Sequence, residues 1–212
     1  MPRRLIQLVL SCVVLGVGVS LLLDARLGSD GYSTLLNGLT LATGWSFLLV
    51  SLVVGVALLT VAWLRGRRPG IGTVVQTVAV GATINVVLPL MPAPDSLVLR
   101  GGEVLLGLLV LAVGVAGYLA VDLGAGPAEA AAQATEPAVP FRWSYTLLQV
   151  TAMGTGWLLG GDVGVATVLV ALLIGPLVSR IQPWLTPAAL RPATVAAAPG
   201  PAGSPETNAA PC

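Results

Sequence analysis

Few side chains in this 212-residue sequence can take part in chemistry. It has nine acidic residues, ten basic residues that are all arginine, and no histidine. Histidine is the usual acid–base catalyst near neutral pH and the commonest protein metal ligand, so both roles lose their main candidate. The two cysteines, Cys12 and Cys212, lie in an apolar run and at the last residue, which indicates neither a disulfide framework nor a paired metal motif. We therefore expect no metal site and no cofactor.

Motifs for catalysis are also missing. A serine–histidine pair is impossible, and the stretch LGGD has Leu159 where the aspartyl-protease motif GxGD has its first glycine. The G-x-G-x-x-G and Walker A patterns do not occur. We expect the protein not to be an enzyme.

The remaining polar residues could bind or pass a small solute. Within residues 71–91, at 100° per residue, Thr73, Gln76 and Thr77 share one side of a predicted helix, and mostly valine and alanine cover the other. Such a face either packs against another helix or lines a cavity, and Gln149 raises the same alternatives further along. The candidate solute-binding residues are Asp24, Arg26, Thr73, Gln76, Asn85, Glu129 and Gln149.

The elements that position these residues are predicted to cross a membrane. Only 9% of residues are charged and 56% are hydrophobic, whereas about 25% are charged in a soluble domain. Because a membrane helix needs about 20 apolar residues, we predict an all-α, polytopic transmembrane helix bundle of about six spans. The spans are 5–23, 45–64, 71–91, 104–121, 143–161 and 163–179. Only Asp162 separates the last two, so five spans remain an alternative.

Arginine placement favours six spans, because cytoplasmic ends of spans collect positive charge. With a cytoplasmic N-terminus, only Arg26 and Arg100 face outward. The C-terminus is then cytoplasmic as well. The protein is predicted to lie in the cell membrane. The arginines on the cytoplasmic side are Arg3, Arg4, Arg65, Arg67, Arg68, Arg142, Arg180 and Arg191.

The sequence contains an internal repeat. LLLDARLGSDG aligns with GYLAVDLGAGP, Trp45 with Trp143, and GIGTVVQTVAVG at 70–81 with GVATVLVALLIG at 164–175, at offsets between 94 and 98. A three-span unit crosses the membrane an odd number of times, so its second copy must enter the membrane with the opposite orientation. We predict two inverted three-span repeats, at 1–92 and 93–182, and a disordered Pro/Ala-rich cytoplasmic tail at 183–212.

Each copy also contains a segment too short to cross, at 31–43 and 127–137. Short interrupted segments at matching positions often mark the centre of a transporter. A helix beginning at Gly31 or Pro127 would present free N–H groups to an anion. The alternative is an ordinary interfacial loop, with Asp24 and Arg26 among lipid headgroups.

These stretches resemble the YczE/YyaS/YitT-type small bacterial membrane proteins. The similar residues are DARLGSDGYSTLLNGL, TGWS, PGIGT, DLGAGP and GWLLGGDVGVATVLVALLIGPLV, which together extend to about residue 180. This chain departs from the family pattern at Gly31 to Ser33, at Ala128 and Glu129, and at Ala166 in the second GxGT. The resemblance implies a multi-pass cytoplasmic-membrane protein.

The function we predict is binding or transport of a small solute at a site between the inverted repeats. The alternative is a non-transporting scaffold or regulatory subunit that docks a membrane-protein partner through its small-residue helix faces. The expected partners are the lipid bilayer and either a solute or such a protein. The net charge of +1 offers no basic footprint for nucleic acid.

Overall fold

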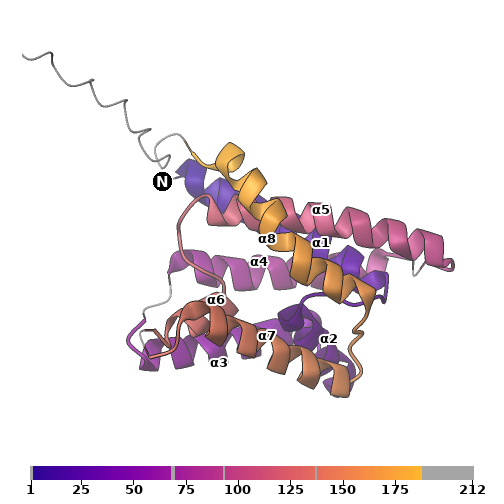
Figure 1. Cartoon of the computed structure of the whole chain (residues 1–212), viewed down its shortest axis with the longest axis horizontal. Coiled ribbons are helices and arrows are strands. Elements are labelled where there is room, and N and C mark those ends of the chain that lie inside the picture. The colour runs from indigo at the N-terminus through magenta and orange to yellow at the C-terminus, as the bar shows by residue number, and fades with distance from the viewer. Residues whose placement is uncertain (1, 68–69, 93, 137, 188–212) are drawn as a thin grey trace, which may run out of the picture.

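The computed structural model describes residues 2–67, 70–92, 94–136 and 138–187, and all of their regular structure is helical. The predicted all-α fold is confirmed. Figure 1 shows the helices running roughly side by side. They are α1 (Pro2–Asp24), α2 (Gly31–Thr43), α3 (Phe47–Leu64), α4 (Ile71–Val87) with the 3-10 turn η1 (Leu88–Leu90), α5 (Leu97–Leu119), α6 (Pro127–Gln133), α7 (Phe141–Leu158) and α8 (Val165–Leu185).

Five of the described helices are long and apolar enough to cross a membrane: α1, α3, α4 with η1, α5 and α8. Helix α7 equals α3 in length but is more polar. All five tryptophans of the chain are exposed near helix ends, as expected of side chains at membrane interfaces. Trp143 and Trp157 lie near the two ends of α7, about 21 Å apart at 1.5 Å per residue. Helix α7 therefore has the dimensions of a sixth span.

Several predicted boundaries differ from the structure. Helix α5 begins at Leu97, not at 104, because Ser96 caps it by accepting a hydrogen bond from Leu99 N at 3.2 Å. Helix α8 is not broken at Pro176 and continues through Pro183 to Leu185. Residues 188–212, which hold most of the predicted tail and Arg191, lie outside the described residues, as does Arg68.

The helix order long, short, long, long occurs twice. Helices α1 to α4 form the first series and α5 to α8 the second. In Figure 1, α1, α4 and α7 run from left to right, whereas α3, α5 and α8 run from right to left. Each long helix of the first series thus runs opposite to its counterpart in the second. The short helices lie toward different ends, α6 at the left and α2 at the right.

Helices α1 and α5 lie against each other at the centre of the packing. Helix α4 packs on α1, and α8 packs in the same way on α5. The short helices cross between the series, since α2 packs on α7 and α6 on α3. The apolar core between them contains fully buried Leu8, Cys12, Leu22 and Ile84.

The repeated Leu-Gly motif makes the same contact twice, each time with the other series. Ala166 N, at the start of α8, donates to Leu27 O at 2.9 Å, and Gly72 N, at the start of α4, donates to Leu123 O at 3.0 Å. The residue that precedes each Leu-Gly pair has a left-handed backbone, with φ of 52° at Arg26 and 49° at Asp122. The loop of each series therefore holds the last long helix of the other.

Glycine is required in these loops. Gly28 has φ of 101° and Gly124 has φ of 136°, outside the range that most side chains tolerate. A Cβ on Gly28 would also lie 2.7 Å from Gly164 N. Backbone conformation and close packing together account for the Leu-Gly repeat in the sequence.

Candidate functional site

A polar cluster lies where the two helix series meet. Three of the predicted residues belong to it: Gln76 of α4, Glu129 of α6 and Gln149 of α7. Asp30, at the start of α2, and the only three tyrosines of the chain complete it. The tyrosines are Tyr32, Tyr118 and Tyr145, on α2, α5 and α7.

The start of α2 is fixed by contacts with its own cap and with α7. Asp30 caps the helix by accepting a hydrogen bond from Ser33 N at 3.1 Å. Gln149 Oε1 accepts from Tyr32 N at 2.9 Å, and its Nε2 donates to the Tyr145 hydroxyl at 3.1 Å. Helix α2 thus begins at Gly31, which is one of the two alternatives that the sequence leaves open, but two of its first N–H groups already have partners. This end of α2 is occupied by a carboxylate and is poorly suited to an anion.

Glu129 lies in the first turn of α6 and faces α5 and α4. Its Oε1 accepts a hydrogen bond from the Tyr118 hydroxyl at 3.1 Å. Gln76, whose side chain also interacts with Tyr118, comes close to the same place. A Cβ added to Gly126 would contact Glu129 Oε2 and lie 2.8 Å from Gln76 Oε1. Glycine at 126 therefore leaves room for these two oxygens beside the start of α6.

The ionisable groups of the cluster with the lowest ordinary pKa are two carboxyl groups, Glu129 and Asp30. Burial raises the pKa of Glu129, the Tyr118 hydroxyl opposes that shift, and the carboxylate of Asp30 adds to it. Tyr145 interacts with both carboxylates. A carboxyl group in this setting takes up a proton at higher pH than an exposed one does.

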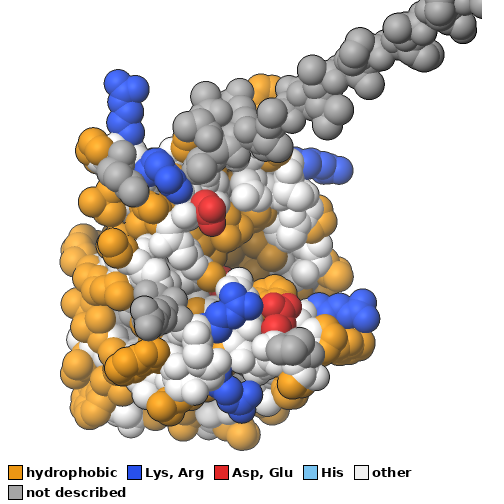
Figure 2. All heavy atoms as spheres, turned by 90° about the vertical axis from the view of Figure 1, so that its left-hand side faces the viewer, with side chains coloured by type: hydrophobic (Ala, Val, Ile, Leu, Met, Phe, Trp, Pro, Cys, Tyr) orange, Lys and Arg blue, Asp and Glu red, His pale blue; other side chains and the backbone are white. Residues whose placement is uncertain are grey.

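The cluster is closer to one end of the bundle than to the other. Gln76 lies five residues after the start of α4, and Gln149 eight residues after the start of α7, which at 1.5 Å per residue is about 8 and 12 Å. Figure 2 looks onto that end and shows a hollow in its middle, surrounded by basic and acidic side chains. Arg67 of the α3–α4 loop pairs with Glu136 at 3.5 Å.

The other four predicted residues do not join the cluster. Thr73 is buried at the start of α4, where its hydroxyl lies close to Gly124 in the Leu-Gly contact. Arg26 is exposed in the α1–α2 loop, and Asn85 is half-buried near the far end of α4. Asp24 ends α1 and is 8% exposed.

Asp24 has an acidic neighbour that sequence patterns did not single out. It interacts electrostatically with Glu103 of α5, and Arg100 acts on Glu103 with the opposite sign. One oxygen of each carboxylate is buried without a hydrogen-bond partner among the described residues. This acidic pair lies at the end of the bundle opposite the hollow.

The tyrosines are not among the predicted site residues, because each lies in a different segment of the sequence. Tyrosine usually lies at membrane interfaces, where its hydroxyl reaches water. Tyr118 lies near the end of α5, where such a position is ordinary, yet it is only 3% exposed. Nothing in the sequence sets the three tyrosines apart from its more numerous serines and threonines as the polar groups of the interior.

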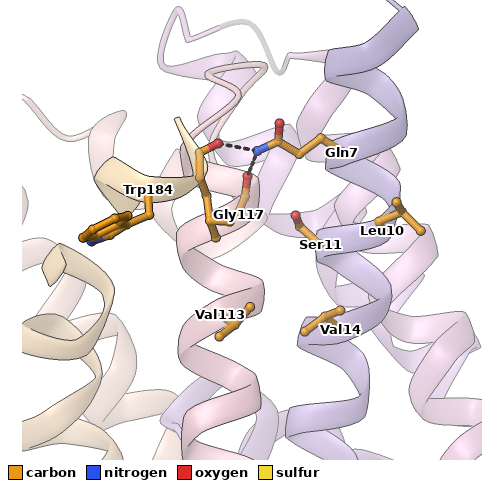
Figure 3. Close-up of a pocket in the computed structure, with 8 residues that line it drawn as sticks. Gln7, Leu10, Ser11, Val14, Val113, Gly117 and Trp184 are labelled. Atoms are coloured by element: carbon orange, nitrogen blue, oxygen red, sulfur yellow. Dashed lines mark hydrogen bonds between the residues drawn. The ribbon is translucent and has the colours of Figure 1, made fainter. Parts of the chain in front are cut away.

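A separate groove of about 300 Å³ lies on the outside of the bundle, between α1, α5 and the end of α8. Figure 3 shows Gln7 donating to the carbonyl oxygens of Gly117 and Leu185 at its upper end. Its walls are mostly apolar, and Trp184 on its edge is 84% exposed. None of the predicted site residues lines it. Among the described residues, no group of three His, Cys, Asp or Glu side chains could hold a metal ion.

Apolar helices around a small polar interior define a polytopic membrane protein. The model of a family of unknown function (DUF6198) matches residues 2–183, so the chain belongs to that family. It is 30% identical over 174 residues to an uncharacterized protein of Haemophilus influenzae, which covers 78% of this chain and 77% of that one. It is 28% identical over 175 residues to the uncharacterized membrane protein YczE of Bacillus subtilis, covering 77% of this chain and 78% of that one. The resemblance to YczE-type proteins is confirmed, and no solved structure matches the chain.

Proposed function

We propose that the protein binds a small solute at the polar cluster and moves it across the cell membrane. The polar cluster is the observation on which this proposal rests. Burying a polar group inside a membrane protein costs free energy unless the group has a hydrogen-bond partner or water. In a chain with only 9% charged residues, a cluster of polar groups in the interior therefore indicates a function. The proposal includes no catalytic role.

The arrangement of the two series supports transport between inverted halves. Corresponding helices run in opposite directions, and the two Leu-Gly contacts are equivalent. We propose that residues 1–92 and 93–182 are inverted repeats. In transporters of this type the solute site lies between the repeats, and one repeat rocks against the other to expose it to each side in turn.

Equivalent helices pack differently in the two series, as alternating access requires. Helix α3 lies against α4, where a Cβ on Gly81 would be 3.2 Å from Ser51 Cβ. Gly175 occupies the matching position in α8, yet no heavy atom of the described residues lies within 4 Å of a Cβ built there. The first series is closed between its third and fourth helices, and the second is open. We propose that this state is open toward the hollowed end in Figure 2.

The hollowed end is proposed to face the cytoplasm. The described arginines Arg3, Arg4, Arg65, Arg67, Arg142 and Arg180 belong to helix ends and loops on that side, and Arg26 and Arg100 to the other. This distribution follows the excess of positive charge on cytoplasmic loops. Both ends of the helical region are then cytoplasmic.

The scaffold alternative draws on small-residue helix faces, and many of these are already used inside the bundle. Gly18 faces Leu111 across α1 and α5, and Gly38 faces Gly156 across α2 and α7. Glycines that serve internal packing are not available for a partner helix. This weighs against docking through those faces as the main role.

Thiol labelling tests the proposal without knowledge of the solute. In a background with Cys12→Ala and Cys212→Ser, the single variants Gln149→Cys and Gln76→Cys are exposed to a membrane-impermeant cationic thiol reagent. We expect both to react in inside-out vesicles, because both belong to the proposed solute site and this state is proposed to open toward the cytoplasm. The control Ile84→Cys, on α4 in the apolar core and 1% exposed, should stay unreacted. If neither glutamine position reacts from either side of the membrane, the interior is sealed and the scaffold alternative replaces transport.

A further inference from the structure

The polar cluster has the donor and acceptor balance of a site for a positive charge. Glu129 interacts with a second carboxylate, Asp30, and its neighbours Tyr32, Tyr118 and Tyr145 are neutral near pH 7. The cluster thus contains two carboxyl groups and several neutral oxygens. An anion placed there would meet like charge in a poorly screened interior.

An unpartnered buried oxygen points to a ligand at the same place. The side chain of Gln76 is only 9% exposed, and its Oε1 has no hydrogen-bond partner among the described residues. An amide oxygen is an acceptor only, so what it lacks is a donor or a cation. A Cβ on Gly126 would contact Glu129 Oε2 and lie 2.8 Å from this oxygen and 3.0 Å from Gln76 Nε2, so the ends of both side chains lie beside the start of α6. The Tyr32 hydroxyl is likewise buried and unpartnered.

We propose that Glu129, with Gln76 Oε1 and Asp30, binds a monovalent cation, either an alkali metal ion or a small primary ammonium. Both kinds of cation take carboxylate, amide and hydroxyl oxygens as partners. This inference rests on the proposed function, because it names the class of solute or coupling ion for the same site.

Protons compete with the cation for Glu129. When the site is empty, its carboxyl group holds a proton more readily than an exposed carboxyl group does, and a cation binds to the carboxylate and releases that proton. The titratable groups that face Glu129 are Asp30 and Tyr32 of the α2 region, Tyr118 of α5 and Tyr145 of α7. The described residues of α3 and α4, which also pack on α6, include no acidic or basic side chain. Lower pH should therefore weaken cation binding.

Calorimetric titration of the detergent-purified full chain tests the proposal, with Na⁺, K⁺ and methylammonium added separately at constant ionic strength. N-methylglucamine, which is much bulkier than the three test cations, is the background cation. We expect saturable binding of at least one of the three, with affinity falling severalfold from pH 8 to pH 6. The heat should change with the ionisation enthalpy of the buffer, because a proton is released. The arms distinguish an inorganic ion from an organic ammonium.

Two matched substitutions localise the binding. Glu129→Gln should weaken it at least tenfold, whereas Glu136→Gln, the same change at the exposed surface pair with Arg67, should leave it unchanged. Gln76→Leu should weaken it severalfold and serves as the second variant if Glu129→Gln does not elute as a folded species. No saturable binding of any of the three cations, or equal binding by the wild type and Glu129→Gln, would overturn the proposal. Labelling at Gln149→Cys without cation binding would leave transport standing and remove only the cation.

Discussion

At the scale of the residue, the strictest requirements are in the Leu-Gly loops. Gly28→Ala forces a side chain onto a backbone with φ of 101° and places its Cβ 2.7 Å from Gly164 N. Strain of this kind costs about 1–3 kcal/mol before the clash is counted. We expect a loss of at least about 2 kcal/mol, measured as a fall of several degrees in the melting temperature of the detergent-solubilised protein.

The control for this change is Gly101→Ala. Gly101 lies within α5, and no heavy atom of the described residues is within 4 Å of a Cβ built on it. Alanine favours a helix interior over glycine by about 0.5–1 kcal/mol, so this variant should melt at the same or a higher temperature. Equal melting of the two variants would show that the loop of one series does not hold α8 of the other.

At the scale of the element, α2 depends on its cap. Asp30→Ala removes the acceptor for Ser33 N, which typically costs about 1 kcal/mol, and we expect faster hydrogen exchange in the first turn of α2. Asp30→Asn keeps a capping oxygen and should retain the slow exchange while losing the charge. The pair thus separates the structural role of Asp30 from its charge. Unchanged exchange in both variants would show that Gln149 alone holds the helix start.

Whole elements were largely predictable because each leaves a local signal. Apolar runs had to be as long as the bilayer is thick, and Pro127 and the Asp30–Gly31 step mark where the short helices begin. The start of α5 differs from the predicted span because Arg100 and Glu103 interrupt the apolar run, whereas the helix begins at the Ser96 cap. Sequence patterns also brought Gln76, Glu129 and Gln149 into the candidate set. They did not bring in Tyr32, Tyr118 and Tyr145, because these come together only after the three helices that carry them, α2, α5 and α7, have packed.

At the scale of the whole molecule, the two series are tied together by reciprocal contacts. The first loop holds α8, the second loop holds α4, and the short helices pack on the third helix of the opposite series. A pair of halves joined in this way can rock against each other only if some contacts change while the loops stay docked. On the transport proposal, the difference in surroundings between Gly81 and Gly175 makes the third and fourth helices of each series the surfaces expected to change.

The proposed inverted arrangement predicts which loops share a side of the membrane. The ion pair between Arg67 and Glu136 places the α3–α4 loop and the α6–α7 loop at the same end of the bundle. Reporter domains inserted after Arg67 and after Glu136 should therefore both be cytoplasmic. One inserted after Asp95, between η1 and α5, should be external, because α4 runs from the first of these ends to the other. Paired fluorescent and phosphatase reporters at each position measure this directly. A duplication in parallel orientation would separate the Arg67 and Glu136 reporters across the membrane, and that result would remove the pseudo-two-fold site on which the transport proposal depends.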